Sequence, residues 1–215
     1  MRILIVSGGR IDEKFADAYI RAYQPEYLIA ADRGMEYCKR SGLLPDCIVG
    51  DFDSAEPETL SYFRTFPQIV WKQFQPQKDE TDTELAMKTA FEHGAEELHI
   101  LGATGSRLDH VLANIQLLYQ AMIRDIPAYL VDANNRIGLV DGERIIKKSA
   151  QYGKYVSILP LTTTVEGITL TGFVYPLTKA VLYSSNSLGV SNEIADEQAK
   201  IEVEEGIAIV IESKD

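Results

Sequence analysis

Residues 98–122 read LHILGATGSRLDHVLANIQLLYQAM, and this stretch decides how the chain folds. A short apolar run leads into a loop of small residues, and the loop leads into a helical pattern whose apolar side chains share one face. The apolar positions of that pattern are Leu108, Val111, Leu112, Ile115, Leu118, Tyr119 and Met122. A strand joined by a tight loop to an amphipathic helix is half of a βαβ unit, so the stretch predicts a parallel sheet covered by helices.

The same alternation runs through the first part of the chain. Apolar runs that each precede a helical pattern lie at residues 2–6, 27–31, 46–50 and 69–74. These repeated units extend the predicted parallel sheet from the N-terminus to about residue 125.

The pattern changes after residue 125. Short runs with strand character follow one another, separated by turn signals such as Asp141-Gly142, and no helical period interrupts them. Such a run of short strands is typical of an antiparallel sandwich or barrel. We therefore predict an α/β domain with a mostly parallel sheet over residues 1–125, followed by an all-β, sandwich-like domain over residues 126–215.

Composition excludes several classes of protein. The 215 residues carry a formal net charge of -11. We therefore expect the chain to lack the basic surface that binding to nucleic acids or anionic membranes requires. No apolar run approaches the roughly 20 residues of a membrane span. The two cysteines, Cys38 and Cys47, do not form a Cys-x-x-Cys motif, so neither a disulfide framework nor a zinc site is expected. We expect a cytoplasmic protein with reduced thiols.

Acidic side chains follow two of the predicted strands. Asp32 comes after the second strand, and Asp51 and Asp53 come after the third. Ligands of open α/β sheets bind beyond the carboxyl ends of the strands, and residues i and i+2 of an extended chain point the same way. The pair thus suits Mg²⁺, which prefers carboxylate oxygens together with substrate phosphates. A turn at Asp51 and a helix cap at Asp53 are the structural alternative.

A second acidic group lies in the stretch KDETDTE at residues 78–84. Thr81 and Glu84 fit a capping box and predict that a helix begins there. Asp79 and Asp82 are three residues apart and can approach one side of this helix start. Acids are also favoured in first turns by the helix dipole, so capping and metal binding both stay open for Asp82. Combined with Asp51 and Asp53, however, this much acid favours a bound cation.

The loop at residues 102–107 suits an anion. Small residues between a strand and a helix expose backbone N–H groups, and Arg107 adds a cation that can hold phosphate through two hydrogen bonds. The turn itself is formed by Gly105 and Ser106. Neither the Walker A pattern nor Gly-x-Gly-x-x-Gly occurs in the chain. His110, beside Asp109, is either a base or part of a helix cap.

Five segments together resemble one family. They are ADRG (31–34), PDCIVGDFDS (45–54), KDETDTELA (78–86), GATGSRLDH (102–110) and SNSLGVSNE (185–193), and in this order they are similar to the bacterial thiamine pyrophosphokinases. The resemblance spans nearly the whole chain. It implies transfer of the pyrophosphoryl group of ATP to the hydroxyl of thiamine, yielding thiamine diphosphate and AMP. It also implies Mg²⁺ and a homodimer whose active site lies near the subunit interface.

Site roles follow from the resemblance by position. The residues implied to hold magnesium are Asp51, Asp53 and Asp82, with Asp79 in the same motif, while Asp32 is similar to a further acid of the cleft. The residues implied to meet the nucleotide are Lys78, Arg107, Gly105 and Ser106, and those implied to contact thiamine are Ser191 and Asn192. Some members cover thiamine with a late tryptophan, whereas the only tryptophan here is Trp71, so the covering side chain stays open.

The chemistry agrees with these roles, because phosphoryl-type transfer depends on positioning and charge stabilisation. Asp82 or Asp53 would orient or deprotonate the hydroxyl, and the sequence does not choose between them. Three other hypotheses remain: a phosphatase with an aspartyl nucleophile, a non-catalytic sensor of thiamine or nucleotide, and an acidic scaffold without a ligand.

Overall fold

The computed structural model describes residues 1–215 except Ser54, Pro76 and Lys78. It divides the chain into two units, Met1–Ala133 and Asn134–Asp215. The predicted fold class is confirmed: the first unit is α/β with a parallel sheet, and the second is a β-sandwich. The strand Ala128–Val131 (β6) lies beyond the boundary predicted at residue 125, yet it pairs in parallel with β5 of the first unit.

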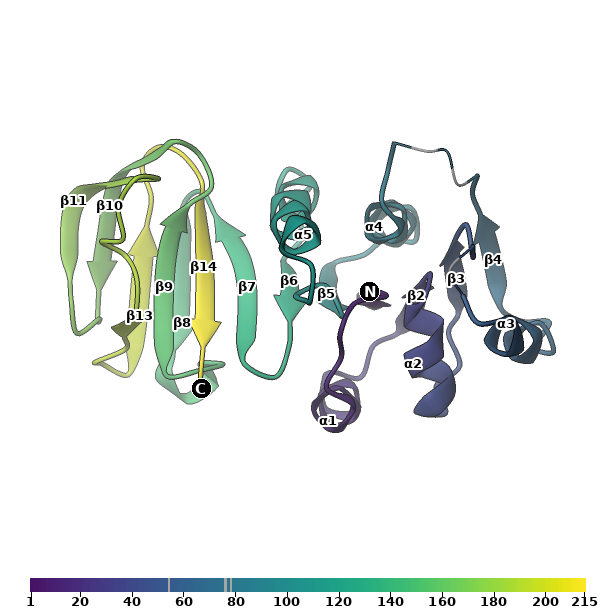
Figure 1. Ribbon diagram of the computed structural model, residues 1–215. Coiled ribbons are helices and arrows are strands. Elements are labelled where there is room, and N and C mark those ends of the chain that lie inside the picture. Colours follow the sequence, from purple (N-terminus) through teal and green to yellow (C-terminus); the bar gives the residue numbers. More distant parts are fainter. Residues whose placement is uncertain (54, 76, 78) are drawn as a thin grey trace. The chain divides into compact units, whose positions relative to one another are not determined.

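The first unit alternates strands and helices along its whole length. Its strands are β1 (Arg2–Val6), β2 (Tyr27–Ala31), β3 (Cys47–Gly50), β4 (Val70–Gln73), β5 (Glu97–Leu101) and β6. Its helices are α1 (Glu13–Tyr23), α2 (Gly34–Arg40), α3 (Pro57–Phe63), α4 (Asp82–Glu92) and α5 (Leu108–Met122). The parallel strands lie in the order β6-β5-β1-β2-β3-β4. Figure 1 shows α4 and α5 on one face of this sheet and α1 and α2 on the other.

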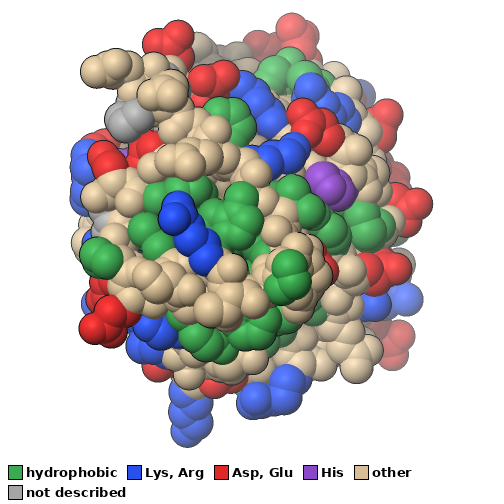
Figure 2. Space-filling view, turned by 90° about the vertical axis from the view of Figure 1, so that its right-hand side faces the viewer, with side chains coloured by type: hydrophobic (Ala, Val, Ile, Leu, Met, Phe, Trp, Pro, Cys, Tyr) green, Lys and Arg blue, Asp and Glu red, His purple; other side chains and the backbone are tan. Residues whose placement is uncertain are grey.

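The central strands β1 and β5 are buried along almost their whole length, which accounts for their continuous apolar runs. At the other end of the order, β4 is an edge strand, and its Val70 side chain is exposed. Figure 2 shows the side of the molecule on which α3 and β4 lie, where hydrophobic side chains surround basic ones. Two cation–π contacts pair basic with aromatic side chains in this part of the first unit, since Lys39 of α2 lies over Tyr62 and Arg64 lies over Trp71.

The second unit consists of antiparallel strands in two sheets. One sheet has the order β12-β9-β14-β7, with bounds Asn192–Glu193, Tyr155–Pro160, Ala208–Ser213 and Asn135–Val140. The other has the order β11-β10-β13-β8, with bounds Leu177–Tyr183, Thr164–Thr171, Gln198–Glu202 and Glu143–Lys147. A single 3-10 turn, Lys148–Ala150, follows β8. The Asp141-Gly142 turn joins β7 to β8, as predicted.

Alternation along the strands builds the core of the second unit. Apolar side chains from both sheets, among them Val156, Ile158, Ile168, Ile201 and Val210, are fully buried in one cluster. Their neighbours along each strand are more exposed, which is the period of two expected of a sandwich.

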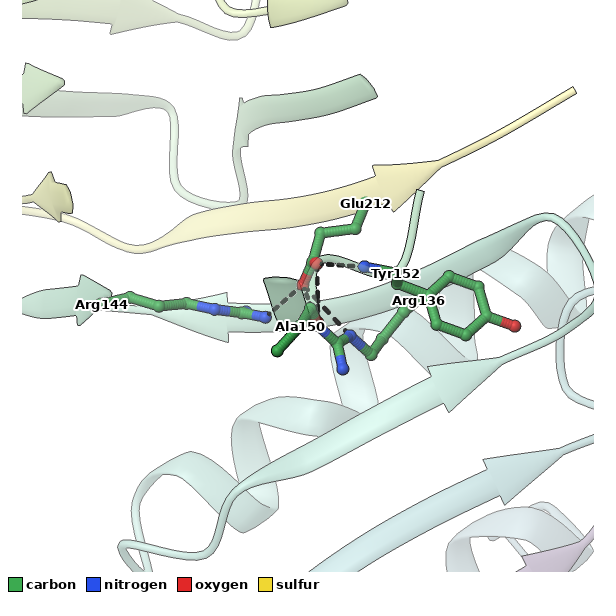
Figure 3. A network of polar contacts seen from close by, with 5 residues as sticks. All are labelled: Arg136, Arg144, Ala150, Tyr152 and Glu212. Carbon is green, nitrogen blue, oxygen red and sulfur yellow. Dashed lines mark hydrogen bonds and ion pairs between the residues drawn. The ribbon is translucent and has the colours of Figure 1, made fainter. Parts of the chain in front are cut away.

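A buried ion network lies at the end of β14 (Figure 3). The Glu212 carboxylate has no solvent exposure and accepts hydrogen bonds from the guanidinium groups of Arg136 and Arg144, at 2.7 to 3.1 Å. The backbone N–H of Tyr152 donates to the same carboxylate at 2.9 Å. The network therefore ties β7, β8 and the segment before β9 to β14.

Replacing Glu212 with alanine is expected to destabilise the protein by about 3 kcal/mol, because two partly buried guanidinium groups lose their buried counterion. Urea unfolding of the wild type and of Glu212→Ala measures the difference. Glu205→Ala is the matched control, since Glu205 is exposed in the loop before β14 and its loss is expected to cost at most about 0.5 kcal/mol. Equal midpoints for the two variants would contradict a stabilising network.

Candidate functional site

The candidate site lies where the strand order of the first unit reverses. The chain runs from β1 outward through β2 and β3 to β4, and then returns to place β5 on the other side of β1. Crevices beyond the carboxyl ends of strands at such a reversal are the usual ligand sites of α/β sheets. A cavity of about 600 Å³ lies there, lined by the loops after β1, β2 and β5 and by the start of α4.

Glycines bring the backbones of these loops into direct contact. A Cβ atom on Gly34 would lie 1.9 Å from the Val6 carbonyl oxygen, and one on Gly9 would lie 2.3 Å from the Gly102 carbonyl oxygen. The Gly9 N–H donates to that same Gly102 oxygen at 3.0 Å. Because no side chain fits between them, the loops after β1 and β5 form one continuous wall of the cavity.

Asp32 and Asp51 follow neighbouring strands. The Asp32 N–H donates to the Val49 carbonyl at 2.8 Å, and a Cβ on Gly50 would lie 3.3 Å from the Asp32 Cα, so the two strand ends touch. Asp32 lines the cavity. Between Asp51 and Asp53, Phe52 has a positive φ of 66° and a buried ring that packs edge-on against Trp71. This anchor fixes the turn that carries both acids.

Asp51 and Asp53 themselves lie beside the cavity and not among its lining residues. The Asp51 carboxylate accepts the Asp53 N–H at 3.2 Å, which is the Asx turn that the structural alternative anticipated. Asp53 is exposed, so its carboxylate faces solvent. The turn and a role toward a cation are compatible, because each Asp51 oxygen has a second lone pair.

Helix α4 begins as its sequence predicts. Thr81 is the N-cap, and its hydroxyl accepts the Glu84 N–H at 3.2 Å. Asp82 is the first helical residue and lines the cavity, whereas Asp79 is exposed outside it. The predicted nucleotide residue Lys78 lies outside the described residues.

Within the described part of the chain, no group of three or more His, Cys, Asp or Glu side chains is close enough to hold a metal ion. The available donors are carboxylates at the ends of β2, β3 and the start of α4. This donor type fits Mg²⁺, which is commonly held by one or two carboxylates while phosphates and water complete its shell.

Arg107 is the N-cap of α5 and lines the cavity together with Gly105 and Ser106. Its guanidinium forms two hydrogen bonds with the Asp109 carboxylate, at 2.5 and 3.2 Å. The hydrogen bond from Arg107 lowers the pKa of Asp109, and both groups are exposed to solvent. His110 also lines the cavity, and its backbone N–H donates to Asp109 at 2.9 Å, so Asp109 serves as a local cap.

Asn114 and Arg10 are among the cavity-lining residues that were given no role from the sequence. Asn114 is 5% exposed, and its side-chain amide donates to the Ala103 carbonyl at 2.9 Å, which holds the loop after β5 to α5. The signal that could have found it is a polar side chain on the buried face of an otherwise apolar helix. Arg10 directly follows the glycine pair after β1.

The predicted pair Ser191 and Asn192 lies in the second unit. Ser191 is exposed, has a positive φ of 58° and donates its N–H to the Ser157 hydroxyl at 3.0 Å. Asn192 is buried, and its amide bonds both backbone groups of Tyr175, at 2.8 and 3.0 Å. The amide is thus engaged within the protein and positions Tyr175, whose side chain is largely exposed.

Two family models match the chain. Residues 21–130 match "Thiamin pyrophosphokinase, catalytic domain", and residues 143–208 match "Thiamin pyrophosphokinase, vitamin B1 binding domain". A thiamine pyrophosphokinase of Bacillus subtilis (strain 168) is 35% identical over 217 residues, which cover 99% of both chains. Thiamine pyrophosphokinase 1 of Oryza sativa subsp. japonica is 28% identical over 82% of this chain and 68% of its own.

Solved structures agree with these matches. The crystal structure of thiamine pyrophosphokinase from Bacillus subtilis has a TM-score of 0.89 at 32% identity and covers all of both chains. That of Geobacillus thermodenitrificans has a TM-score of 0.85 at 33% identity, covering 100% of this chain and 98% of its own. The chain therefore belongs to the thiamine pyrophosphokinase family, and the predicted resemblance is confirmed. None of the helices described here is long and apolar enough to cross a membrane.

Proposed function

We propose that the protein transfers the pyrophosphoryl group of ATP to the hydroxyl of thiamine, releasing AMP and thiamine diphosphate. The observation that carries this proposal is a full-length match to a family of thiamine pyrophosphokinases combined with a cavity whose loops have the chemistry of a phosphate site. We place the reaction in the cytoplasm, where ATP is available and where the buried thiols of Cys38 and Cys47 stay reduced.

The first unit supplies the phosphate chemistry in this proposal. The loop from Gly102 to Ser106 lies against the triphosphate and offers backbone N–H groups, and Arg107 turns from Asp109 toward phosphate oxygens. Lys78 is assigned to the same task from its motif alone.

The acids Asp51, Asp53 and Asp82 would hold Mg²⁺, with Asp32 and Asp79 nearby in the cleft. When bound with ATP, the ion neutralises phosphate charge and makes the β-phosphorus easier to attack. Asp53 or Asp82 then receives a hydrogen bond from the thiamine hydroxyl and directs its oxygen toward the phosphorus.

Phosphorus NMR of the products tests the reaction. We expect equal amounts of AMP and thiamine diphosphate from ATP, Mg²⁺ and thiamine, and no turnover after the metal is removed with EDTA. ADP with thiamine monophosphate would contradict pyrophosphoryl transfer. Inorganic phosphate from ATP without thiamine would favour a phosphatase, and tight binding of both ligands without turnover would favour a sensor.

Acid variants in the same assay test the metal residues. Asp51→Ala and Asp53→Ala are expected to lose turnover, because each removes a carboxylate from the cation. Asp141→Ala is the control, since Asp141 is exposed in the β7–β8 turn of the second unit. Wild-type rates in either site variant would remove that residue from the site.

Tyr175 is our candidate for the ring that covers thiamine. Its side chain is 67% exposed, and Asn192 fixes its backbone from both sides, beside Ser191. An aromatic face fits the cationic thiazolium ring of thiamine through a cation–π contact. Asn192 then contributes to the thiamine site through Tyr175, while the exposed Ser191 hydroxyl is available for direct contact.

Replacing Tyr175 with alanine is expected to raise the KM for thiamine roughly 3- to 30-fold, which is the range of a cation–π contact. The KM for ATP should stay unchanged, and Tyr175→Phe should retain most of the affinity. Tyr183→Ala, at another exposed tyrosine of the second unit, is the matched control. Equal thiamine KM values for the two alanine variants would exclude Tyr175 as the covering ring.

We also propose that the enzyme is a homodimer with helix α5 at the interface. This helix contributes His110 and Asn114 to the cavity lining, yet Leu108, Leu112 and Tyr119 on it are exposed, as is Ile123 directly after it. An apolar helix face of this kind is usually covered by a partner, and in homo-oligomers the partner is most often a second copy. The interface would then adjoin the site.

Sedimentation velocity tests the dimer. We expect the wild type to sediment as a dimer and Leu112→Glu to sediment as a monomer, because the variant buries a charge in an apolar contact. Ile145→Glu on the exposed side of β8 should leave the dimer intact. A monomeric wild type, or a dimer in all three proteins, would contradict the assigned interface.

A further inference from the structure

We infer that Arg10 binds the phosphate groups of the nucleotide and that, among the described arginines of the cavity, it is the one whose charge the free protein keeps ready for them. The inference deepens the proposed function and rests on it. It concerns a residue that lies outside the motifs on which the family resemblance was based, and its support is the geometry of the loop after β1.

The backbone of Arg10 is fixed to the loop that faces the phosphates. Its N–H donates to the Gly105 carbonyl at 2.9 Å, next to the hydrogen bond from Gly9 to Gly102. A Cβ on Gly9 would lie 2.4 Å from the same Gly105 oxygen, so the loops after β1 and β5 pack backbone against backbone at this point. The side chain of Arg10 therefore starts from a fixed point, and Arg10 is one of the residues that line the cavity.

Charge pairing distinguishes Arg10 from the other arginines of the cavity, Arg33 and Arg107. Arg107 is held by the two hydrogen bonds to Asp109, and the Arg33 Nε lies 3.6 Å from the Glu36 carboxylate. Among the residues that the structure describes, Arg10 forms no ion pair, and its side chain is exposed. Two of the three guanidinium charges are thus balanced by neighbouring acids, while that of Arg10 is left for a ligand.

The acids that line the cavity make such a cation necessary. The cavity is also lined by Asp32, Glu80 and Asp82, of which Glu80 is already paired with Lys88 at 2.9 Å. A polyphosphate entering a cavity of this acidity requires cationic side chains of the protein as well as a metal ion. A guanidinium group offers two parallel hydrogen bonds to phosphate oxygens, which a lysine cannot reproduce.

Calorimetric titrations of the full-length protein with ATP and with adenosine separate phosphate binding from binding of the base and sugar. We expect Arg10→Ala to weaken ATP about 10- to 100-fold, the range of a charge-assisted contact, and to leave the affinity for adenosine unchanged. Arg10→Lys should recover part of the loss. Arg21→Ala, at an exposed arginine on α1 outside the cavity, should match the wild type.

Kinetics give an independent readout. The KM for ATP should rise in Arg10→Ala while the KM for thiamine stays constant. Equal ATP affinity in the Arg10 and Arg21 alanine variants would overturn the inference, as would a parallel loss of adenosine binding, which would mean that the loop had collapsed. If the wild type makes no thiamine diphosphate, the proposed function fails, while the titrations still decide whether Arg10 binds phosphate.

Discussion

The candidate site depends on how closely the backbones of three loops approach one another at the carboxyl edge of the parallel sheet. Gly34 lies against the end of β1, and Gly9 and Gly102 bring the loops after β1 and β5 into contact, at distances that leave no room for a Cβ atom. Hydrogen bonds between backbone groups then join these loops into one wall. The position of every ligand-facing side chain on that wall follows from this packing.

Charge is distributed unevenly around the cavity. Carboxylates come from Asp32 after β2 and from Glu80 and Asp82 at the start of α4, and guanidinium groups come from the loops after β1, β2 and β5. In a chain with a net charge of -11, three arginines around one cavity are a local exception. A phosphate chain bound there would have its charge balanced by these guanidinium groups together with a metal ion held by the acids, which is what transfer of a phosphoryl-type group requires.

In the second unit, buried polar side chains fix the positions of neighbouring backbone segments. Glu212 gathers two arginines and a backbone N–H at the end of β14, and Asn192 holds both backbone groups of Tyr175. A buried polar side chain must satisfy its hydrogen bonds, so it permits only one arrangement of the segments it joins. The backbone of the exposed Tyr175 is therefore held in place by the buried Asn192 amide.

Local patterns in the sequence were enough for the fold class, for the starts of α4 and α5, for the turn at Asp141-Gly142 and for the acids at the ends of β2 and β3. Each of these depends on neighbours within a few residues, through capping, turn geometry or the period of a strand or helix. The resemblance to one family rested on motifs of the same local kind, and it was confirmed.

The burial of individual side chains and their hydrogen-bond partners depend on contacts between segments that are distant in the sequence. The apolar stripe of α5 predicted a helix, yet only the tertiary structure shows Leu118 buried and Leu112 exposed, because burial depends on what packs against each face. The engagement of Asn192 with Tyr175, of Arg107 with Asp109 and of Asn114 with Ala103 likewise required coordinates. The sequence by itself determined which elements form and which chemistry their ends carry, because both depend on neighbours along the chain. The tertiary structure decided which of those groups are already paired and which, like Arg10, line the cavity without an ion pair to any described residue, because pairing depends on contacts between distant segments.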